Sequence, residues 1–385
     1  MVSVQGTHLS SLLHDLTAVV SSRRELESMA AEWDILAASN AVPMLSHAWI
    51  QACAESLYDE DDLHVITVRT GGKLTGAAPL VRRVHAGMVR LELAGVAELY
   101  EPSGLLYDTD DALDALLRAV MDGRRPVLLS RIPVLSPIIP RLRSLVRGRG
   151  VMFAKPGAGT LAVPISLGWS EFQGQTSSRH RYDLKRARRR AEESGPVTTR
   201  IYNPAPEDVA ALLTDFARVE ASGWKARNGS SLSQRKTLRQ FFLNYCTRAA
   251  HAGTVRFAFL EVNGRSIAAQ LSVVYADRLW VLKIGYDETW SRCSPGQLLL
   301  ADTMRDAFDH KLKSYEFLGT DEPWLHRWNT EVRSFSTVTC YPPTFLGLCG
   351  LAADTASRAI SRTGTLLAGF DRRRLTGRIG FRPRR

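Results

Sequence analysis

The sequence predicts an α/β (α+β) chain in which one mixed unit of helices and mostly antiparallel strands is built twice. The order helix, helix, β-hairpin, strand, helix, strand runs through residues 24–132 and again through residues 208–319. The two hairpins can also be aligned: TGGKLTGAAPLV (70–81) matches VNGRSIAAQLSV (262–273), with Gly72 on Gly264. A repeated order with a matching turn indicates two copies of one unit.

Composition is consistent with two folded domains. The 385 residues suffice for two full cores, and 45% apolar with 23% charged residues is typical of a globular chain. The net charge of +11 favours a polyanionic partner, namely nucleotide phosphate, nucleic acid or an anionic membrane. Charge alone does not choose among these partners.

Cysteine usage and hydropathy suggest a compartment. The five cysteines form no C-x-x-C pair and are odd in number, which favours a reducing cytoplasm and gives no reason to expect a metal site. We see neither a signal peptide nor an apolar run of 18 or more residues. We therefore expect a cytoplasmic protein, with peripheral attachment to the inner face of the membrane as an open alternative.

The first unit combines helical and strand patterns. A strand is expected at 16–20, and the spacing of Leu26, Met29, Trp33 and Leu36 predicts a helix over 24–40. Ser46 is the expected N-cap of a second helix. Strands are then expected at 63–70, 73–84, 88–95 and 126–132, with a helix at 111–121.

The second unit repeats this order. Helices are expected at 208–221, 234–250 and 297–310, and strands at 255–262, 266–275, 278–286 and 314–319. The Gly-rich basic stretch RGRGVMFAKPGAGT separates the units. We therefore expect domains at 1–155 and 156–343, followed by a basic amphipathic tail at 344–385.

The turn Ser294-Pro295-Gly296 distinguishes the second unit from the first. It leads from a strand into a helix with no acidic cap, whereas the first unit has VAELYEPSGLLYD at the corresponding place. A helix N-terminus leaves about four N–H groups unpaired and carries roughly half a positive charge. It can therefore hold a phosphate. The alternative is an ordinary helix with Ser294 as N-cap and Pro295 at the first position.

Three segments resemble the GNAT superfamily of acyl-CoA N-acyltransferases: NGRSIAAQLSVVY, KIGYDETWSRCSPGQLLL and YEFLGTDEPWLHRW. Within it, the chain is similar to the two-domain branch of CelD-type and BioF-associated acetyltransferase domains, and more distantly to Fem-type transferases. The resemblance covers roughly residues 15–340 and is specific over about 155–335. Cys293, and Trp324-Leu325-His326, depart from the aromatic and the Tyr-Lys that the family often has. The second departure puts in doubt any role of that lysine.

This resemblance implies tandem GNAT-like domains, with the first one degenerate. It implies acyl-CoA as co-substrate, with no tightly bound cofactor, and an amine acceptor entering between the domains. The pyrophosphate would lie on the N–H groups of Gly296, Gln297 and Leu298, with Ser294 in the turn and Arg292 adding charge. The strand at 278–286 would diverge from its neighbour, and the pantetheine arm would pair with its free edge.

Candidate proton-transfer residues flank this turn. Asp287 ends the expected cofactor strand and is the first candidate for base or amine-binding carboxylate, although a turn residue is the alternative. Glu322, with Asp321, and His326 are further candidates, because both residue types transfer protons near neutral pH. Tyr286 could protonate the leaving thiolate. Each also has an ordinary structural interpretation as a cap, a surface residue or packing.

Two basic segments remain. SSRHRYDLKRARRRAEESG (177–195) predicts a helix capped by Ser177 or Ser178, with a narrow apolar stripe at Leu184, Ala187 and Ala191. It suits an anionic ligand or simply a solvated face. Residues 351–375 predict an amphipathic helix that either lies on an anionic membrane or packs on the domain.

The expected function is acyl transfer from acyl-CoA, acetyl or longer, to an amine of an envelope, polysaccharide or amino-lipid precursor. A Fem-type aminoacyl-tRNA-dependent transferase is the alternative enzyme, and a basic adaptor on nucleic acid or membrane is the non-enzymatic one. Nucleic acid is not favoured as a partner, because the sequence shows no recognisable nucleic-acid-reading motif.

Overall fold

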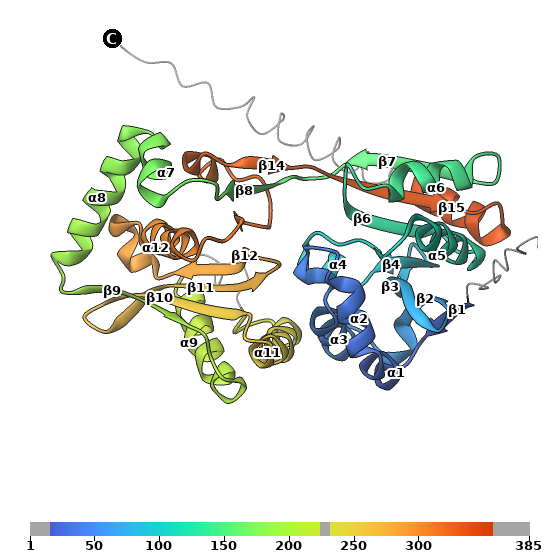
Figure 1. Ribbon diagram of the computed structural model, residues 1–385, viewed down its shortest axis with the longest axis horizontal. Helices are drawn as coiled ribbons and strands as arrows, with labels where there is room; N and C mark the ends of the chain where they lie inside the picture. The colour runs from blue at the N-terminus through green and yellow to red at the C-terminus, as the bar shows by residue number, and fades with distance from the viewer. Residues whose placement is uncertain (1–15, 224–231, 357–385) are drawn as a thin grey trace, which may run out of the picture.

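The computed structural model describes residues 16–223 and 232–356, and these form two α/β halves side by side (Figure 1). The first sheet has the order β1-β2-β3-β4-β6-β15-β7, with β5 on β3, and the second has the order β14-β8-β13-β12-β11-β10-β9. The expected fold class, two mostly antiparallel sheets flanked by helices, is confirmed.

The first sheet consists of β1 (Leu16–Val20), β2 (Leu63–Thr70), β3 (Lys73–His85), β4 (Met88–Leu93), β5 (Leu106–Tyr107), β6 (Val127–Pro133), β7 (Val151–Pro156) and β15 (Phe335–Tyr341). The second consists of β8 (Thr160–Pro164), β9 (Val197–Tyr202), β10 (Val255–Val262), β11 (Arg265–Tyr275), β12 (Arg278–Tyr286), β13 (Ser314–Glu316) and β14 (Glu331–Arg333).

The helices of the first half are α1 (Arg23–Ser28), α2 (Ala30–Ala37), α3 (His47–Ser56), α4 (Val96–Leu99), α5 (Asp110–Asp122) and α6 (Ile138–Val146). Those of the second half are α7 (Trp169–Gln175), α8 (Ser178–Glu192), α9 (Val209–Ala221), α11 (Lys236–His251) and α12 (Pro295–Asp309). Short 3₁₀ turns are η1 (Pro43–Leu45), η2 (Glu60–Asp62), η3 (Pro206–Asp208), η4 (Glu288–Cys293) and η5 (Leu325–Trp328). Residues 345–356 are also helical.

The two sheets repeat one topology. Read from β1 and from β9, each sheet begins with four antiparallel strands. A parallel pair then follows, β4 with β6 in the first sheet and β12 with β13 in the second. The next strand in the first sheet is β15, which follows β14 of the second sheet along the chain. The next strand in the second sheet is β8, which follows β7 of the first sheet. Each half therefore donates the continuation of its last strand to the other.

This exchange changes the division expected from sequence. The predicted second unit, 156–343, includes β15, yet β15 pairs with β6 and β7 of the first sheet. Sequence could not show this, because pairing across such a separation depends on the assembled sheets. Two local boundaries also differ: the helix expected over 24–40 is divided at Met29 into α1 and α2, and the last expected strand ends at Glu316.

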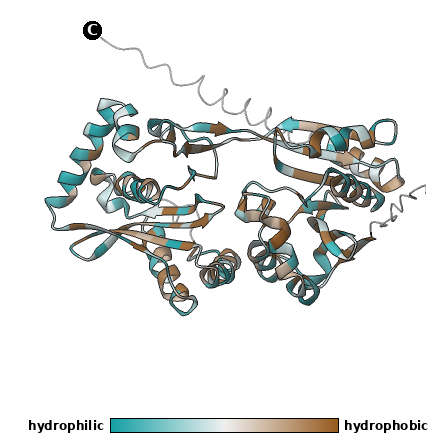
Figure 2. Cartoon of the chain, in the orientation of Figure 1, coloured by the Kyte–Doolittle hydropathy of each residue, from teal (hydrophilic) through white to brown (hydrophobic). Residues whose placement is uncertain are grey.

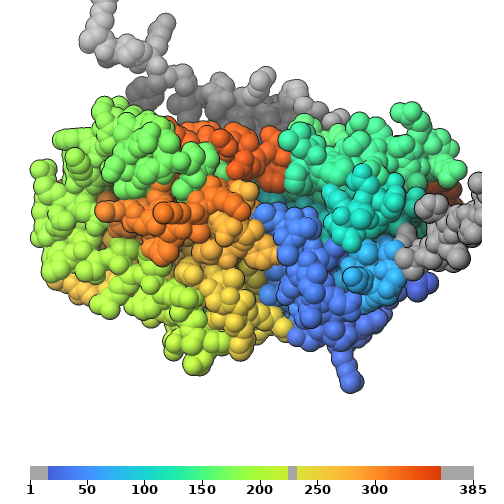
Figure 3. All heavy atoms as spheres, in the orientation of Figure 1, coloured from blue at the N-terminus to red at the C-terminus, as the bar shows by residue number. Residues whose placement is uncertain are grey.

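The halves share one apolar core. The ring of Trp49 on α3 lies 4.9 Å from that of Phe241 and 4.8 Å from that of Tyr245, both on α11. Figure 3 shows the blue N-terminal helices directly against the yellow α11. One cluster of buried side chains runs through this contact from both halves. Because the interface is apolar and continuous, the first half can fix surfaces of the second.

Among the described helices, none is long and apolar enough to cross a membrane. The described residues also contain no group of three His, Cys, Asp or Glu side chains that could hold a metal ion.

Candidate active site

The strand β12 leaves its neighbour β13 after the first three residues of β12. It pairs with β11 from end to end, but its parallel ladder with β13 joins only Arg278–Trp280 to Ser314–Glu316. From there β12 continues to Tyr286 while the chain after β13 turns away. The divergence expected for this strand is confirmed.

A β-bulge lies at the same place. On β11, Leu271 faces Lys283 and Ser272 faces Val281, so β12 carries one extra residue, Leu282. A bulge bends a strand and re-aims its side chains, and bulges are common next to active sites. Here it turns the second half of β12 towards the start of α12.

The start of α12 lacks a side-chain cap. Ser294 adopts a left-handed conformation (φ 45°, ψ 52°), and its side chain makes no capping hydrogen bond. Pro295 occupies the first turn, and no acidic residue is present there. Ser294 therefore occupies the N-cap position with Pro295 after it, as the alternative expected, but its side chain leaves the amides of the first turn uncapped.

The backbone amides of this turn differ from the expected arrangement. The N–H groups of Gln297 and Leu298 both donate to the Ser294 carbonyl, at 2.9 and 3.2 Å. Leu298 also buries its side chain in a core cluster. The amide of Gly296 is among those that a helix cannot satisfy internally. Of the three amides expected to hold a pyrophosphate, Gly296 is the one best suited.

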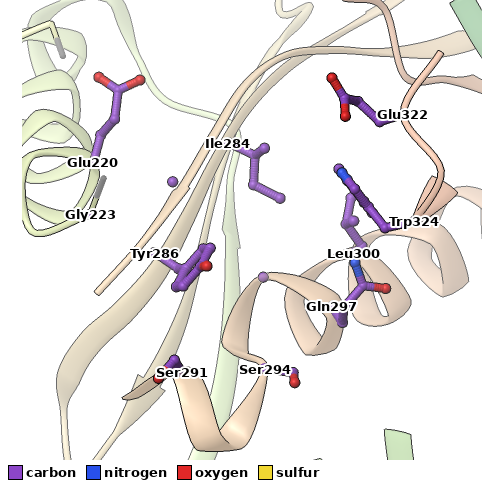
Figure 4. A pocket seen from close by; sticks show the side chains of 12 residues that line it. Glu220, Gly223, Ile284, Tyr286, Ser291, Ser294, Gln297, Leu300, Glu322 and Trp324 are labelled. Carbon is purple, nitrogen blue, oxygen red and sulfur yellow. The ribbon is translucent and has the colours of Figure 1, made fainter. Parts of the chain in front are cut away.

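A cavity of about 580 Å³ opens between β12, α12 and the end of α9 (Figure 4). It is lined by Glu220, Gly223, Ile284, Gly285, Tyr286, Ser291, Ser294, Gly296, Gln297, Leu300, Glu322 and Trp324. Five residues expected in the site are among them: Tyr286, Ser294, Gly296, Gln297 and Glu322. Arg292, Leu298, Asp287 and His326 are not.

Gln297 offers a buried polar atom to this cavity. Its Oε1 is buried and has no hydrogen-bond partner among the described residues. Unsatisfied buried acceptors are costly and rare in folded proteins. The side chain lies beside Trp324 in the cavity wall (Figure 4). It is therefore suited to accept an N–H from a bound molecule.

Glu220 is a buried carboxylate in the cavity wall that the sequence reasoning missed. It is 1% exposed, and its Oε2 accepts from the Leu232 amide at 2.8 Å. Its Oε1 lies 3.9 Å from the Nζ of Lys283 on β12. A carboxylate held between a backbone donor and a cation at the wall of a cavity is a candidate for proton transfer.

Two glycines make room for this carboxylate. A Cβ on Gly285 would lie 2.8 Å from the Cα of Glu220, and one on Gly223 would lie 2.9 Å from the Tyr286 carbonyl oxygen. The end of α9 can therefore touch β12 only where both side chains are absent. The sequence signal was the pair of glycines, Gly223 just after α9 and Gly285 near the end of β12, but nothing local linked them to Glu220.

Asp287 is occupied by structural contacts. Its Oδ2 accepts from Arg265 at 2.8 Å, and its Oδ1 accepts from the amide and hydroxyl of Thr289 at 3.0 and 2.7 Å. Burial raises the pKa of Asp287, but these hydrogen bonds outweigh it and hold the pKa below its usual value. The base role stays a prediction that the geometry does not favour, because the carboxylate caps η4.

Glu322 lies on the loop after β13, and His326 lies in η5, which follows that loop. The Nε2 of His326 lies 2.5 Å from Asp321 Oδ1, and both side chains are about half exposed outside the cavity lining. Glu322 and Trp324, in contrast, face the cavity opposite Tyr286 (Figure 4). The position of Glu322 is thus compatible with its expected role in proton transfer, whereas His326 lies outside the cavity lining.

The first half holds this loop in place. Buried Arg131 donates from Nη2 to the Gly319 carbonyl at 2.9 Å, and Glu101 accepts from the Gly319 amide at 3.5 Å. The Arg131 guanidinium lies between the rings of Tyr100 and Phe335, 4.5 and 5.2 Å from their centroids. Burial raises the pKa of Glu101 to about 8, although Arg131 opposes the shift. The first domain therefore positions one wall of the cavity.

A second cavity, of about 300 Å³, lies at the seam between the halves. It is lined by Trp49, Glu98, Leu99, Tyr100, Glu101, Arg235, Leu238, Phe242, Leu282 and Lys283. Its edge on β12 adjoins the larger cavity, because Leu282 and Lys283 precede Ile284 directly. The Glu220–Lys283 pair marks this junction.

Helix α8 places positive charge near the turn. Ser177 caps it, since its hydroxyl accepts from the His180 amide, and Ala187 and Ala191 are buried as expected. Its remaining surface is hydrophilic (Figure 2). Arg190 donates to the backbone carbonyl of Arg292 at 3.2 Å, so the Arg190 guanidinium lies against the turn before α12.

Comparison with known proteins agrees with this geometry. Residues 178–325 match the family model of the acetyltransferase (GNAT) domain. Residues 178–325 therefore carry a GNAT-type acetyltransferase domain. A search of curated proteins found no match to the chain.

Solved structures show the same doubled fold. FemX has a TM-score of 0.60 at 13% identity, covering 88% of this chain and 100% of its own. The C-terminal domain of a candidate lysylphosphatidylglycerol synthetase from Agrobacterium fabrum has a TM-score of 0.54 at 10% identity, covering 87% and 97%. A conserved protein of unknown function from Bacteroides thetaiotaomicron has a TM-score of 0.50 at 11% identity, covering 84% and 99%. At these identities the likeness concerns the fold alone.

Proposed function

We propose that the protein is an acyl-CoA-dependent N-acyltransferase that acts on an amine of an envelope, polysaccharide or amino-lipid precursor. The observation that carries this is the cavity at the uncapped start of α12, beside the point where β12 leaves β13. A reducing, cytoplasmic setting suits the free thiols of all five cysteines.

The donor fits the cavity in three respects. The Gly296 amide and the positive end of α12 suit a pyrophosphate. The divergence of β12 leaves strand edge for an amide-bearing arm, and Gln297 Oε1 can accept an N–H from it. Arg190 and Arg292 supply positive charge behind the turn, where further phosphate oxygens would lie.

The reaction needs a neutral amine and a protonated leaving group. The amine nitrogen attacks the thioester carbon, the C–N bond forms, the C–S bond breaks, and the amine loses a proton while the thiolate gains one. Glu220, or Glu322 across the cavity, would take the amine proton, and Tyr286 would give one to the sulfur. Proton transfer of this kind contributes about 10²–10⁴-fold, and positioning contributes much of the rest.

The acceptor would enter at the seam between the domains. The smaller cavity leads to the junction at Glu220 and Lys283. Its walls combine aromatic rings with the acidic side chains of Glu98 and Glu101, beside the cations Arg235 and Lys283. Such walls suit an amine attached to a partly apolar body.

The test is native mass spectrometry of the purified protein with free CoA, acetyl-CoA and longer acyl-CoAs, followed by turnover with amine panels. We expect one CoA per chain and release of free thiol only when an amine is present. Absence of CoA binding at millimolar concentration would exclude the proposal.

Aminoacyl transfer from tRNA is the second candidate, because the fold match includes the whole of the FemX chain. The same assay separates the two: charged tRNA, rather than acyl-CoA, would then be the donor that the protein consumes.

A further inference from the structure

A basic cavity and an exposed apolar helix face lie together on the first half, away from the α12 cavity. The cavity, of about 450 Å³, is lined by the ends of α5 and α6 and by the segment after β15. Its charged lining residues are Arg118, Arg124, Arg149 and Asp122. The lining therefore has a net positive charge.

The three arginines are exposed and available. Within the described residues, none of their guanidinium groups makes an ion pair. Their neighbour Arg141 differs, since it pairs with Asp110 and Asp114 at 2.6 and 2.8 Å. Unpaired guanidinium groups around a hollow are suited to phosphate oxygens.

The helix at residues 345–356 starts at the rim of this cavity. The Thr344 hydroxyl accepts from the Gly347 amide and donates to the Arg124 carbonyl, both at 3.1 Å. On its inner face a Cβ on Gly350 would lie 2.4 Å from the Pro126 ring. Buried Asp354 accepts from the Tyr341 hydroxyl and lies 3.3 Å from His85. This face is therefore docked on the first domain.

The opposite face is apolar and open. Phe345 and Leu348, three residues apart, are 80% and 62% exposed, and Ala352 continues the stripe. Ala356, the last described residue, is also exposed on this stripe, and Ala359 follows at the same spacing in the sequence. An exposed apolar stripe beside unpaired cations is characteristic of a surface that binds a membrane.

We propose that this face, defined by Phe345, Leu348, Arg118, Arg124 and Arg149, docks on an anionic phospholipid membrane. The two apolar side chains would enter the boundary between head groups and acyl chains, while the arginines contact lipid phosphates. A nucleic acid would use the arginines but offers nothing for an aliphatic side chain such as Leu348. This inference does not depend on the proposed function.

The test is sedimentation of the full chain with vesicles of phosphatidylglycerol and phosphatidylcholine, and with phosphatidylcholine alone, at low and high salt. The triple substitution Arg118→Gln, Arg124→Gln, Arg149→Gln should weaken binding about a hundredfold, since each arginine near an anionic surface contributes about fivefold. The matched control is Arg218→Gln, Arg239→Gln, Arg305→Gln, which removes equal charge from exposed sites on α9, α11 and α12 and should have a much smaller effect.

A second pair of variants separates insertion from charge. Phe345→Ser with Leu348→Ser should weaken binding roughly tenfold or more and should do so even at high salt. The control is Ile35→Ser with Leu135→Ser, side chains that are 78% and 96% exposed elsewhere. A chain ending after Ala356 should still bind anionic vesicles.

Three results would overturn the proposal. One is equal binding by the arginine triple and its control. Another is loss of binding on truncation after Ala356 while both docking-face variants bind normally. The third is binding to tRNA or heparin without binding to anionic vesicles. Thermal unfolding of each variant checks that the substitutions leave the fold intact.

Discussion

Helices α5 and α12 occupy corresponding places in the two halves, yet their N-termini are built for opposite purposes. At α5, the Thr109 hydroxyl accepts from the Ala112 amide, and Asp110 and Asp111 fill the first turn. At α12, no side chain caps the helix, the first turn has no acid, and Gly296 opens onto a cavity. Self-capping and its two aspartates make the start of α5 unsuited to anions, whereas the start of α12 is the one that we propose a ligand completes.

The largest expected effect is at Gly296. Gly296→Glu places a carboxylate where the proposal puts a pyrophosphate, so CoA affinity should fall by at least a hundredfold, measured by calorimetry. Gly296→Ala is the matched control, because its Cβ would meet only the edge of Tyr286 at 3.4 Å. Equal CoA affinity of wild type and the Glu variant would contradict the assignment of α12 as the anion site.

Substitutions at Glu220 and Asp287 test which carboxylate beside α12 takes the proton of the amine. Glu220→Gln keeps the shape but removes the proton acceptor, so kcat should fall by about 10²–10⁴-fold while CoA affinity changes little. Asp287→Asn should instead cost about 1 kcal/mol of stability, since it weakens the cap of η4 and the Arg265 pair. If Asp287→Asn lost turnover and Glu220→Gln did not, the original assignment of Asp287 would be right.

The Glu101 contact tests how the first half supports the second. Burial raises the pKa of Glu101 to about 8, so between the unfolded pKa of about 4.3 and this value the folded chain holds a proton that the unfolded chain has released. Stability should therefore fall as pH rises through this window. Glu101→Gln should remove that loss, gaining roughly 1–2 kcal/mol over wild type at pH 8.5 and little at pH 4.

Urea unfolding of wild type and Glu101→Gln across this pH range measures the difference. A constant difference between the two proteins at all pH values would show that Glu101 does not titrate in this window.

The smallest expected effect lies at the caps themselves. Thr109→Ala should cost about 1 kcal/mol of stability and leave CoA affinity unchanged, because it removes a cap far from the cavity. Ser294→Ala should cost little stability, because its side chain caps nothing. Thermal unfolding checks both, and a larger loss in Ser294→Ala would mean that the two helix starts are alike.

The sequence by itself determined the local features of this protein. The hairpins 63–84 and 255–275 follow from alternation and from Gly-containing turns, and both lie within a residue or so of the observed β2, β3, β10 and β11. The turn before α12 was also visible, because Ser294-Pro295-Gly296 is a local signal. Tyr286, Ser294, Gly296 and Gln297 lie in or near that turn in sequence, whereas Glu322 was expected because it follows the strand in SYEFLG and could face the same cleft.

Only the tertiary structure decided what depends on distant segments. Glu220 reaches the cavity because Gly285 and Gly223 let α9 touch β12, and about 60 residues separate Glu220 from that strand. Asp287 has a structural role because Arg265, across the hairpin, reaches it. The exchange of β8 and β15 and the hold of Arg131 on Gly319 likewise depend on which surfaces meet, and no local pattern encodes that.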